Sequence, residues 1–208
     1  MAAPTYPLNH PSTPAFTNSS WRLVRSNGIS ESPFTGKQQV YEYDYALWEA
    51  EISLPPMLRS QAAAWCAFFM KLHGQRGTFL LGDPDAESAQ GTITGSNTLS
   101  ANASVGDFTL TISSGQNSIT GIFKAGDYVQ LGTAATSKLY MVVDDADSNS
   151  SGIVSVQIEP KVKTAVSSGG SVVVANPRAL MRMSGDELGW STDQVSKYGI
   201  TFACKEAF

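Results

Sequence analysis

The chain has 208 residues, and 14 basic against 18 acidic side chains leave it a formal net charge of −4. Charged residues make up only 15% of the sequence and lysine and arginine do not cluster, which argues against a protein that grips nucleic acid through its phosphates. Apolar residues reach 42%, enough for a hydrophobic core, yet none of their runs approaches the length of about 18 that a membrane-spanning helix needs.

The only cysteines, Cys66 and Cys204, both lie among apolar residues. Neither belongs to a Cys-x-x-Cys pair, and neither histidine is close enough in sequence to complete a local zinc motif. Because free cysteine is among the most buried residue types, we expect two reduced core thiols, as suits folding in a reducing cytoplasm. A disulfide or a reactive thiol is the alternative.

The N-terminal segment, residues 1–20, is rich in proline, with Pro4, Pro7, Pro11 and Pro14. Proline fixes φ and removes a hydrogen-bond donor, so this segment is predicted to be an extended arm that lies against a neighbour or is disordered. It has no basic stretch followed by an apolar one, so we expect no secretory signal.

Polar and apolar residues alternate from Gln39 to Leu54, which predicts a long strand after a shorter one at Trp21–Arg25. The apolar side changes parity near Ala46–Trp48, and one extra residue in a β-bulge would explain the change. We then expect one face of the strand to point into the core through Tyr41, Tyr43, Tyr45, Ala50, Ile52 and Leu54. The other face would carry four carboxylates with no basic residue between them: Glu42, Asp44, Glu49 and Glu51.

Pro55 and Pro56 end this strand and open a predicted helix that runs to about His73. Its apolar residues recur at helical spacing: Leu58, Ala62, Trp65, Phe69 and Leu72. We expect Leu58, Trp65 and Phe69 to form the core of the helix against a sheet. Gly74 then ends the helix, and a strand follows at Thr78–Leu81.

Residues 91–176 have a different composition, rich in small and β-branched residues, with no tryptophan and no helical stripe. Turn clusters separate candidate strands at Thr98–Val105, Phe108–Ser113, Tyr128–Leu131, Lys138–Val143, Ile153–Ile158 and Ser171–Val174, as in a small all-β barrel or sandwich. Strand character returns at Leu180–Met183 and Tyr198–Cys204.

The economical organisation is therefore an insertion. Residues 21–90 and 177–208 form one split domain, and residues 91–176 form a β module set into one of its loops. Two sequential domains with a tail are the alternative, but that arrangement leaves residues 177–208 without a core. The predicted fold class is mainly β with one helix.

Motifs for catalysis are missing from the sequence, which has no phosphate-binding loop, nucleophile elbow or metalloprotease helix. His10 lies in the proline-rich arm, and His73 at a helix end is explained by the helix dipole. The run Asp83–Glu87 reads as a polar turn. The run from Asp145 begins like a calcium loop but has Ser150 and Val156 where glycine and glutamate belong. We expect no catalytic, cofactor or metal site.

Three runs in this order resemble minor tail proteins of long non-contractile-tailed bacteriophages, and among these the distal tail protein: Trp48–Met57, Ala62–Gly74 and Gly77–Pro84. The stretches Phe123–Leu131, Leu139–Val143 and Val156–Pro160 fit the inserted module of such proteins. The resemblance covers about residues 20–208. It implies a β-rich ring domain with one helix, usually hexameric, decorated by a peripheral module, and it carries over no catalytic residue.

The function expected from this resemblance is that of a structural subunit in a virion tail, assembled in the host cytoplasm. The ring would join the tail tube protein to a tail hub or other tail-tip proteins, and DNA would only pass through its channel. Glu42, Asp44, Glu49 and Glu51 would then line the channel and repel phosphates. The alternative is a carbohydrate-binding module for host attachment, suggested by the polar loops of the insertion. A hydrolase is the least favoured reading, because no base and nucleophile come together.

Overall fold

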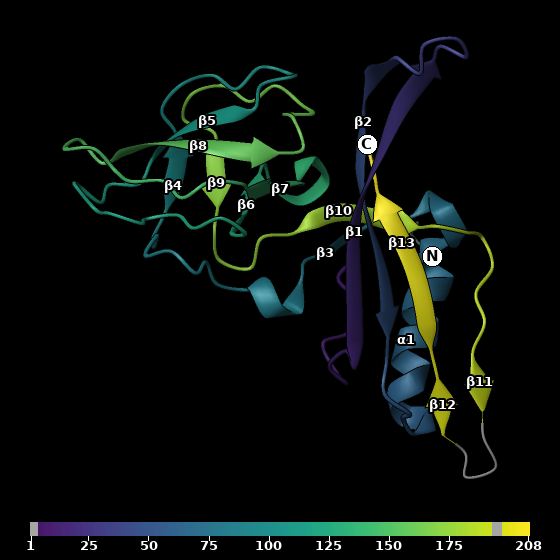
Figure 1. Cartoon of the computed structure of the whole chain (residues 1–208). Helices are drawn as coiled ribbons and strands as arrows, with labels where there is room; N and C mark the ends of the chain where they lie inside the picture. The colour runs from purple at the N-terminus through teal and green to yellow at the C-terminus, as the bar shows by residue number, and fades with distance from the viewer. Residues whose placement is uncertain (1–3, 193–196) are drawn as a thin grey trace.

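The computed structural model describes residues 4–192 and 197–208, which form an open sheet with a helix on one face and a closed barrel beside it (Figure 1). The chain is mainly β, and α1 (Arg59–Leu72) is the one α-helix of the described residues. The expected fold class and the small all-β barrel are therefore confirmed.

Five strands build the open sheet in the order β1-β2-β13-β10-β3, with every neighbouring pair antiparallel. Their bounds are β1 (Asn18–Glu31), β2 (Gln38–Ser53), β3 (Phe79–Leu81), β10 (Ala179–Met183) and β13 (Thr201–Glu206). The last strand of the chain thus lies between β2 and β10, where Cys204 pairs with Ala50 on one side and with Met183 on the other. The side chains of Ile200, Phe202 and Cys204 are buried on one face.

Helix α1 covers that face and buries Ala62, Trp65, Phe68, Phe69 and Leu72. The expectation that Leu58 belongs to the helix core is wrong, because Leu58 is the extended N-cap residue and its side chain is 54% exposed. Met57 is buried instead, in a segment whose backbone pairs with Tyr198. The helix ends where His73 and Gly74 both take the left-handed conformation.

The N-terminal arm lies on its own chain. Leu8 forms a parallel bridge with Phe79, and the side chains of Tyr6, Leu8 and Phe16 pack against the core of the sheet and helix. His10 stacks on Trp65 with 5.9 Å between ring centroids, and the Trp65 indole Nε1 donates to the carbonyl of Thr13 at 3.2 Å. Only residues 18–20 of the expected arm belong to a strand.

The barrel closes in the order β4-β5-β8-β7-β6-β9, with its own core of buried aliphatic and aromatic residues. Its strands are β4 (Asn97–Leu99), β5 (Thr109–Ser113), β6 (Tyr128–Leu131), β7 (Lys138–Val142), β8 (Ile153–Glu159) and β9 (Ser171–Val173). They agree with the predicted strands to within two residues, except that the strand expected at Thr98–Val105 ends at Leu99. Short elements complete the chain: η1 (Gly74–Arg76), η2 (Pro84–Ala86), η3 (Ala134–Thr136), β11 (Ser191–Thr192) and β12 (Tyr198–Gly199).

The replacement Trp65→Ala should lower the free energy of unfolding by about 3–5 kcal/mol, because it empties a fully buried site that five aromatic rings surround. Urea denaturation followed by circular dichroism measures the loss. Leu58→Ala is the control, and its exposed side chain should change the stability by no more than about 0.5 kcal/mol. Equal losses in the two variants would contradict the burial of Trp65.

Candidate functional site

The strands β1 and β2 continue past the edge of the sheet as a two-stranded hairpin, at the top of Figure 1. A turn at Pro33–Gly36 joins them, and Ser32 and Lys37 close it with a backbone hydrogen bond of 2.9 Å. The strand predicted at Trp21–Arg25 continues further than expected, because Asn27 and Gly28 pair with Glu42 and Tyr41. Gly28 leaves room for the Tyr43 ring, whose hydroxyl would lie 3.1 Å from an added Cβ.

The hairpin contains one irregularity. Arg25 pairs with Ala46 and Asn27 pairs with Glu42, so Tyr43–Tyr45 lie opposite Ser26 alone. The hairpin thus contains a bulge, but it is not the predicted one, because it falls three residues before Ala46–Trp48 and adds two residues rather than one. Two added residues preserve the alternation of side chains, so a bulge does not account for the change of parity.

The expectation that Tyr41, Tyr43 and Tyr45 face the core is wrong, because their side chains are 54%, 58% and 47% exposed. The core of the sheet ends near Leu47, and the hairpin runs on beyond it. Ala50, Ile52 and Leu54 are buried, as predicted. The alternating pattern identified the strand correctly, but it gave no information on where the helix and the core stop covering the strand.

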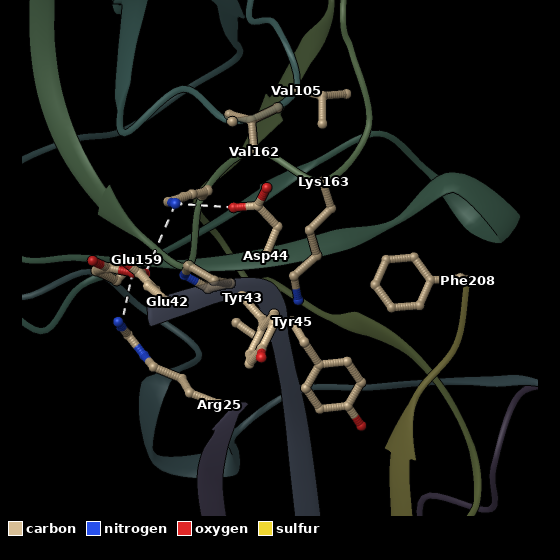
Figure 2. A pocket seen from close by; sticks show the side chains of 14 residues that line it. Arg25, Glu42, Tyr43, Asp44, Tyr45, Val105, Glu159, Val162, Lys163 and Phe208 are labelled. Atoms are coloured by element: carbon tan, nitrogen blue, oxygen red, sulfur yellow. Dashed lines mark hydrogen bonds and ion pairs between the residues drawn. The ribbon is translucent and has the colours of Figure 1, made fainter. Parts of the chain in front are cut away.

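A cavity of about 190 Å³ lies between the base of this hairpin and the barrel (Figure 2). The hairpin contributes Arg25 and the segment 42–46, the barrel side contributes Val105 and the segment 159–163, and Phe208 closes the far end. Figure 2 shows Tyr45 and Phe208 on one side and Arg25, Glu42 and Glu159 on the other. The cavity therefore joins parts of the chain that are far apart in sequence.

Ion pairs connect the two walls of the cavity. The Arg25 guanidinium lies 2.8 Å from the Glu159 carboxylate, and the Lys161 ammonium lies 3.0 Å from Asp44 and 3.8 Å from Glu42. The hydrogen bond to Asp44 raises the pKa of Lys161 above its ordinary value. Exposed pairs of this kind contribute little stability, but together they fix which side chains face each other.

The four carboxylates expected to form a row without basic neighbours do not do so. Glu42 and Asp44 share Lys161, and Glu49 is paired with Arg22 at 2.7 Å. Glu51 is exposed on the face of the sheet opposite the helix. The register also places the basic residues Arg22, Lys205 and Arg182 on that face. The prediction missed this because cross-strand partners come from distant parts of the chain.

Behind the cavity, a buried carboxylate joins three parts of the molecule. Glu206 on β13 is 2% exposed, and it accepts hydrogen bonds from the Trp48 backbone N–H at 3.2 Å and from the Lys163 ammonium. Burial lowers the pKa of Lys163, and Glu206 opposes that shift. Lys138 donates to the carbonyl of Ala207, and its ammonium lies 4.3 Å from the centre of the Phe208 ring.

Trp48 forms the apolar part of the same junction. Its indole Nε1 donates to the carbonyl of Leu139 on β7 at 2.9 Å, and its ring meets Tyr128 of β6 edge-on at 5.8 Å. Tyr128 and Leu139 thus belong to the core of the sheet as well as to barrel strands. Lys138, Lys163 and Glu206 could not be recognised as buried from the sequence, because nothing in their sequence neighbours distinguishes them from exposed charges.

The carboxylates of the acidic loops bind backbone N–H groups and one lysine. Asp83 accepts from the N–H of Asp85 at 3.2 Å, and Asp147 accepts from the N–H of Gly121 at 2.6 Å. Asp145 pairs with Lys124 at 2.6 Å. Among residues 4–192 and 197–208, no group of three or more metal-ligating side chains is placed to hold an ion.

Both cysteines are free. Cys204 is buried, and burial raises the pKa of its thiol to about 12. The expectation of a core thiol is confirmed for Cys204, whereas Cys66 is only half-buried.

A scan against models of known protein families found no match, and a search of curated proteins found no significant match. In the part of the chain that the structure describes, no helix combines the length and hydrophobicity that crossing a bilayer requires.

The variant Tyr140→Phe tests the packing behind the cavity. Tyr140 is fully buried, its hydroxyl accepts from the N–H of Lys163, and burial raises its pKa from 10.0 to about 12. Between those values the unfolded chain loses the proton and the folded one keeps it, so the wild type loses stability as pH rises from 10 to 12.

The phenylalanine variant lacks this proton, so its free energy of unfolding should fall less than that of the wild type between pH 10 and 12. The difference between the two losses should be about 1.4 kcal/mol for each unit by which the pKa of Tyr140 differs between the folded and unfolded states. Urea denaturation at several pH values across this range gives the two slopes. Identical slopes would mean that Tyr140 ionises freely in the folded protein.

Proposed function

We propose that the protein is a structural subunit of a bacteriophage tail tip. Copies of the chain, six in the arrangement that the resemblance implies, form a ring that joins the tail tube to the distal tail and leaves a channel for DNA. The observation that carries the proposal is the projecting hairpin, whose apolar side chains nothing in the described chain covers: Ile29, Phe34, Val40 and Tyr41 are 67%, 94%, 60% and 54% exposed.

A two-stranded hairpin on its own is marginally stable in water, and three or more strands or a packing partner are needed to hold it. Grouped apolar side chains on a surface mark sites of interaction with another protein. The tip of this hairpin has only two strands, because it extends beyond the sheet, and it presents exposed apolar side chains from both of them. A neighbouring molecule that covers the hairpin supplies what the single chain lacks.

The edges of the sheet support contact between copies. β1 is an edge strand of 14 residues and leaves a row of backbone donors and acceptors free for another strand. The opposite edge, β3, is short and is bridged by Leu8 of the arm. Because the two edges differ, contacts between them would be head-to-tail, and such contacts close into rings when the rotation permits.

Within the ring, we assign the face of the sheet opposite α1 to the channel. Glu49 and Glu51 lie on this face together with Arg22, Lys205 and Arg182, so the wall carries mixed charge. Paired charges offer no continuous basic track to the phosphates of passing DNA. Glu42 and Asp44 lie beside Lys161 of the barrel side and are not assigned to the channel. The tube and hub proteins would contact the two ends of the ring.

Light scattering of the purified protein tests this function, and we expect the mass of an oligomer and ring-shaped particles by electron microscopy. Phe34→Ser combined with Val40→Ser should shift the mass to that of a monomer while circular dichroism remains unchanged. Val143→Ser is the control, since it removes an exposed apolar side chain of the barrel. A wild type that stays monomeric at all concentrations would contradict the ring, and assembly unaffected by the hairpin variant would exclude the hairpin as its contact.

A further inference from the structure

We propose that the cavity between the hairpin base and the barrel binds a neutral saccharide. This role is additional to the ring and does not depend on it. It also differs from a site in the barrel loops, because half of the lining comes from the hairpin.

The aromatic side chains at the cavity are the first argument. Tyr43, Tyr45 and Phe208 line it and are 58%, 47% and 70% exposed. Pockets for small molecules combine apolar and aromatic walls with a few oriented polar groups. The C–H faces of a sugar ring stack on aromatic rings, whereas its hydroxyls require polar partners at the edge. Phe208 is also held in place, by the Lys138 and Lys163 ammonium groups at 4.3 and 5.8 Å from its ring centre.

The polar groups of the cavity provide those partners. The Lys161 ammonium contacts one oxygen of Asp44 and one oxygen of Glu42, and all three residues line the cavity. The Arg25–Glu159 pair borders the same space. Planar carboxylate and guanidinium groups accept from and donate to hydroxyls in fixed directions, so the cavity offers both kinds of partner.

The balance of charge selects a neutral ligand. Three cations, Arg25, Lys161 and Lys163, and three anions, Glu42, Asp44 and Glu159, line the cavity. Arg25 and Lys161 pair with these anions and Lys163 pairs with the buried Glu206, so positive charge is not in excess. A phosphate or sulfate would have to compete with carboxylates that already hold these cations. A cationic ligand would meet Lys161 at the same carboxylates.

The size and rigidity of the cavity fit one or two sugar rings. Its volume of about 190 Å³ lies below the range of roughly 300–1,000 Å³ for sites that take drug-sized ligands. Its floor is formed by the buried segment at Val162 and Lys163, and the Lys161 ammonium lies 5.0 Å from the centre of the Phe108 ring. A floor built from buried residues does not have to be ordered when the ligand binds, which favours affinity.

An array of neutral, sulfated and sialylated oligosaccharides, probed with the labelled full chain, tests the proposal. We expect binding to neutral oligosaccharides. We expect no binding that requires the sulfate or sialic acid groups of the charged ones. The best neutral oligosaccharide is then titrated by calorimetry against the wild type, Tyr45→Ala, Tyr43→Ala and Tyr41→Ala. Tyr41 is the control, because it lies on the same strand, is 54% exposed and does not line the cavity.

Tyr45→Ala and Tyr43→Ala should each weaken binding at least about tenfold, and Tyr41→Ala should leave it within about twofold. Binding to charged glycans alone, to no glycan, or equally by all four proteins would overturn the site. Light scattering of the same samples separates this proposal from the ring. An intact oligomer that binds no sugar would contradict the cavity proposal alone. A monomer that still binds sugar would contradict the ring alone.

Discussion

The buried carboxylate of Glu206 links the sheet to the barrel side. A charge inside a protein is costly unless it is paired and hydrogen-bonded, and here the Trp48 N–H and the Lys163 ammonium both bind one oxygen of Glu206, while its other oxygen is buried without a hydrogen-bond partner among the described residues. One partner comes from β2, the other from the barrel side, and the carboxylate itself from β13. Removing any one of the three leaves an uncompensated group in an apolar junction. Together with the contacts of Trp48 to Leu139 and Tyr128, this interaction joins the barrel to the sheet beside the cavity.

The two proposals assign different tasks to the two ends of one hairpin. Its tip, with Phe34 and Val40, extends away from the rest of the chain and suits contact with another subunit. Its base is tied to the barrel side by Arg25–Glu159 and Lys161–Asp44 and forms the wall of the cavity. The bulge at Tyr43–Tyr45 lies in this base, and its residues line the cavity. A subunit of this design could assemble through one region and still present a ligand site in another.

Local patterns in the sequence were sufficient to predict most elements. In β8 the buried residues alternate with exposed ones along Ile153–Ile158. In α1 the buried residues Trp65, Phe69 and Leu72 recur at helical spacing. Both patterns can be read from a few neighbouring residues. The tyrosines of β2 show the same alternation, but their burial depends on whether another element covers them, and no element among residues 4–192 and 197–208 does so. Leu58 fails for a related reason, because the helix begins one residue after it.

The candidate site was outside the reach of such patterns. Lys163 and Glu206 are 43 residues apart, and only the fold makes them neighbours. Glu42 and Asp44 were predicted to belong to a row of four carboxylates, but Lys161, which they share, is 117 residues away from Asp44. The assignment of residues 91–176 as a separate insertion stays a prediction, and the shared contacts of Trp48 with Tyr128 and Leu139 mean that the two parts do not have fully separate cores.

The order of the strands also determines what happens while the chain is being made. All barrel strands lie between Asn97 and Val173 and are complete before β13 leaves the ribosome. β2, in contrast, pairs with β13 across 154 residues, from Ala50 to Cys204. At about 5–20 residues per second, the inner edge of β2 stays unpaired for roughly 8–30 seconds of translation. During that interval the nascent chain carries an open strand edge next to a finished barrel, and a chaperone that shields β2 would protect it from pairing with another nascent chain.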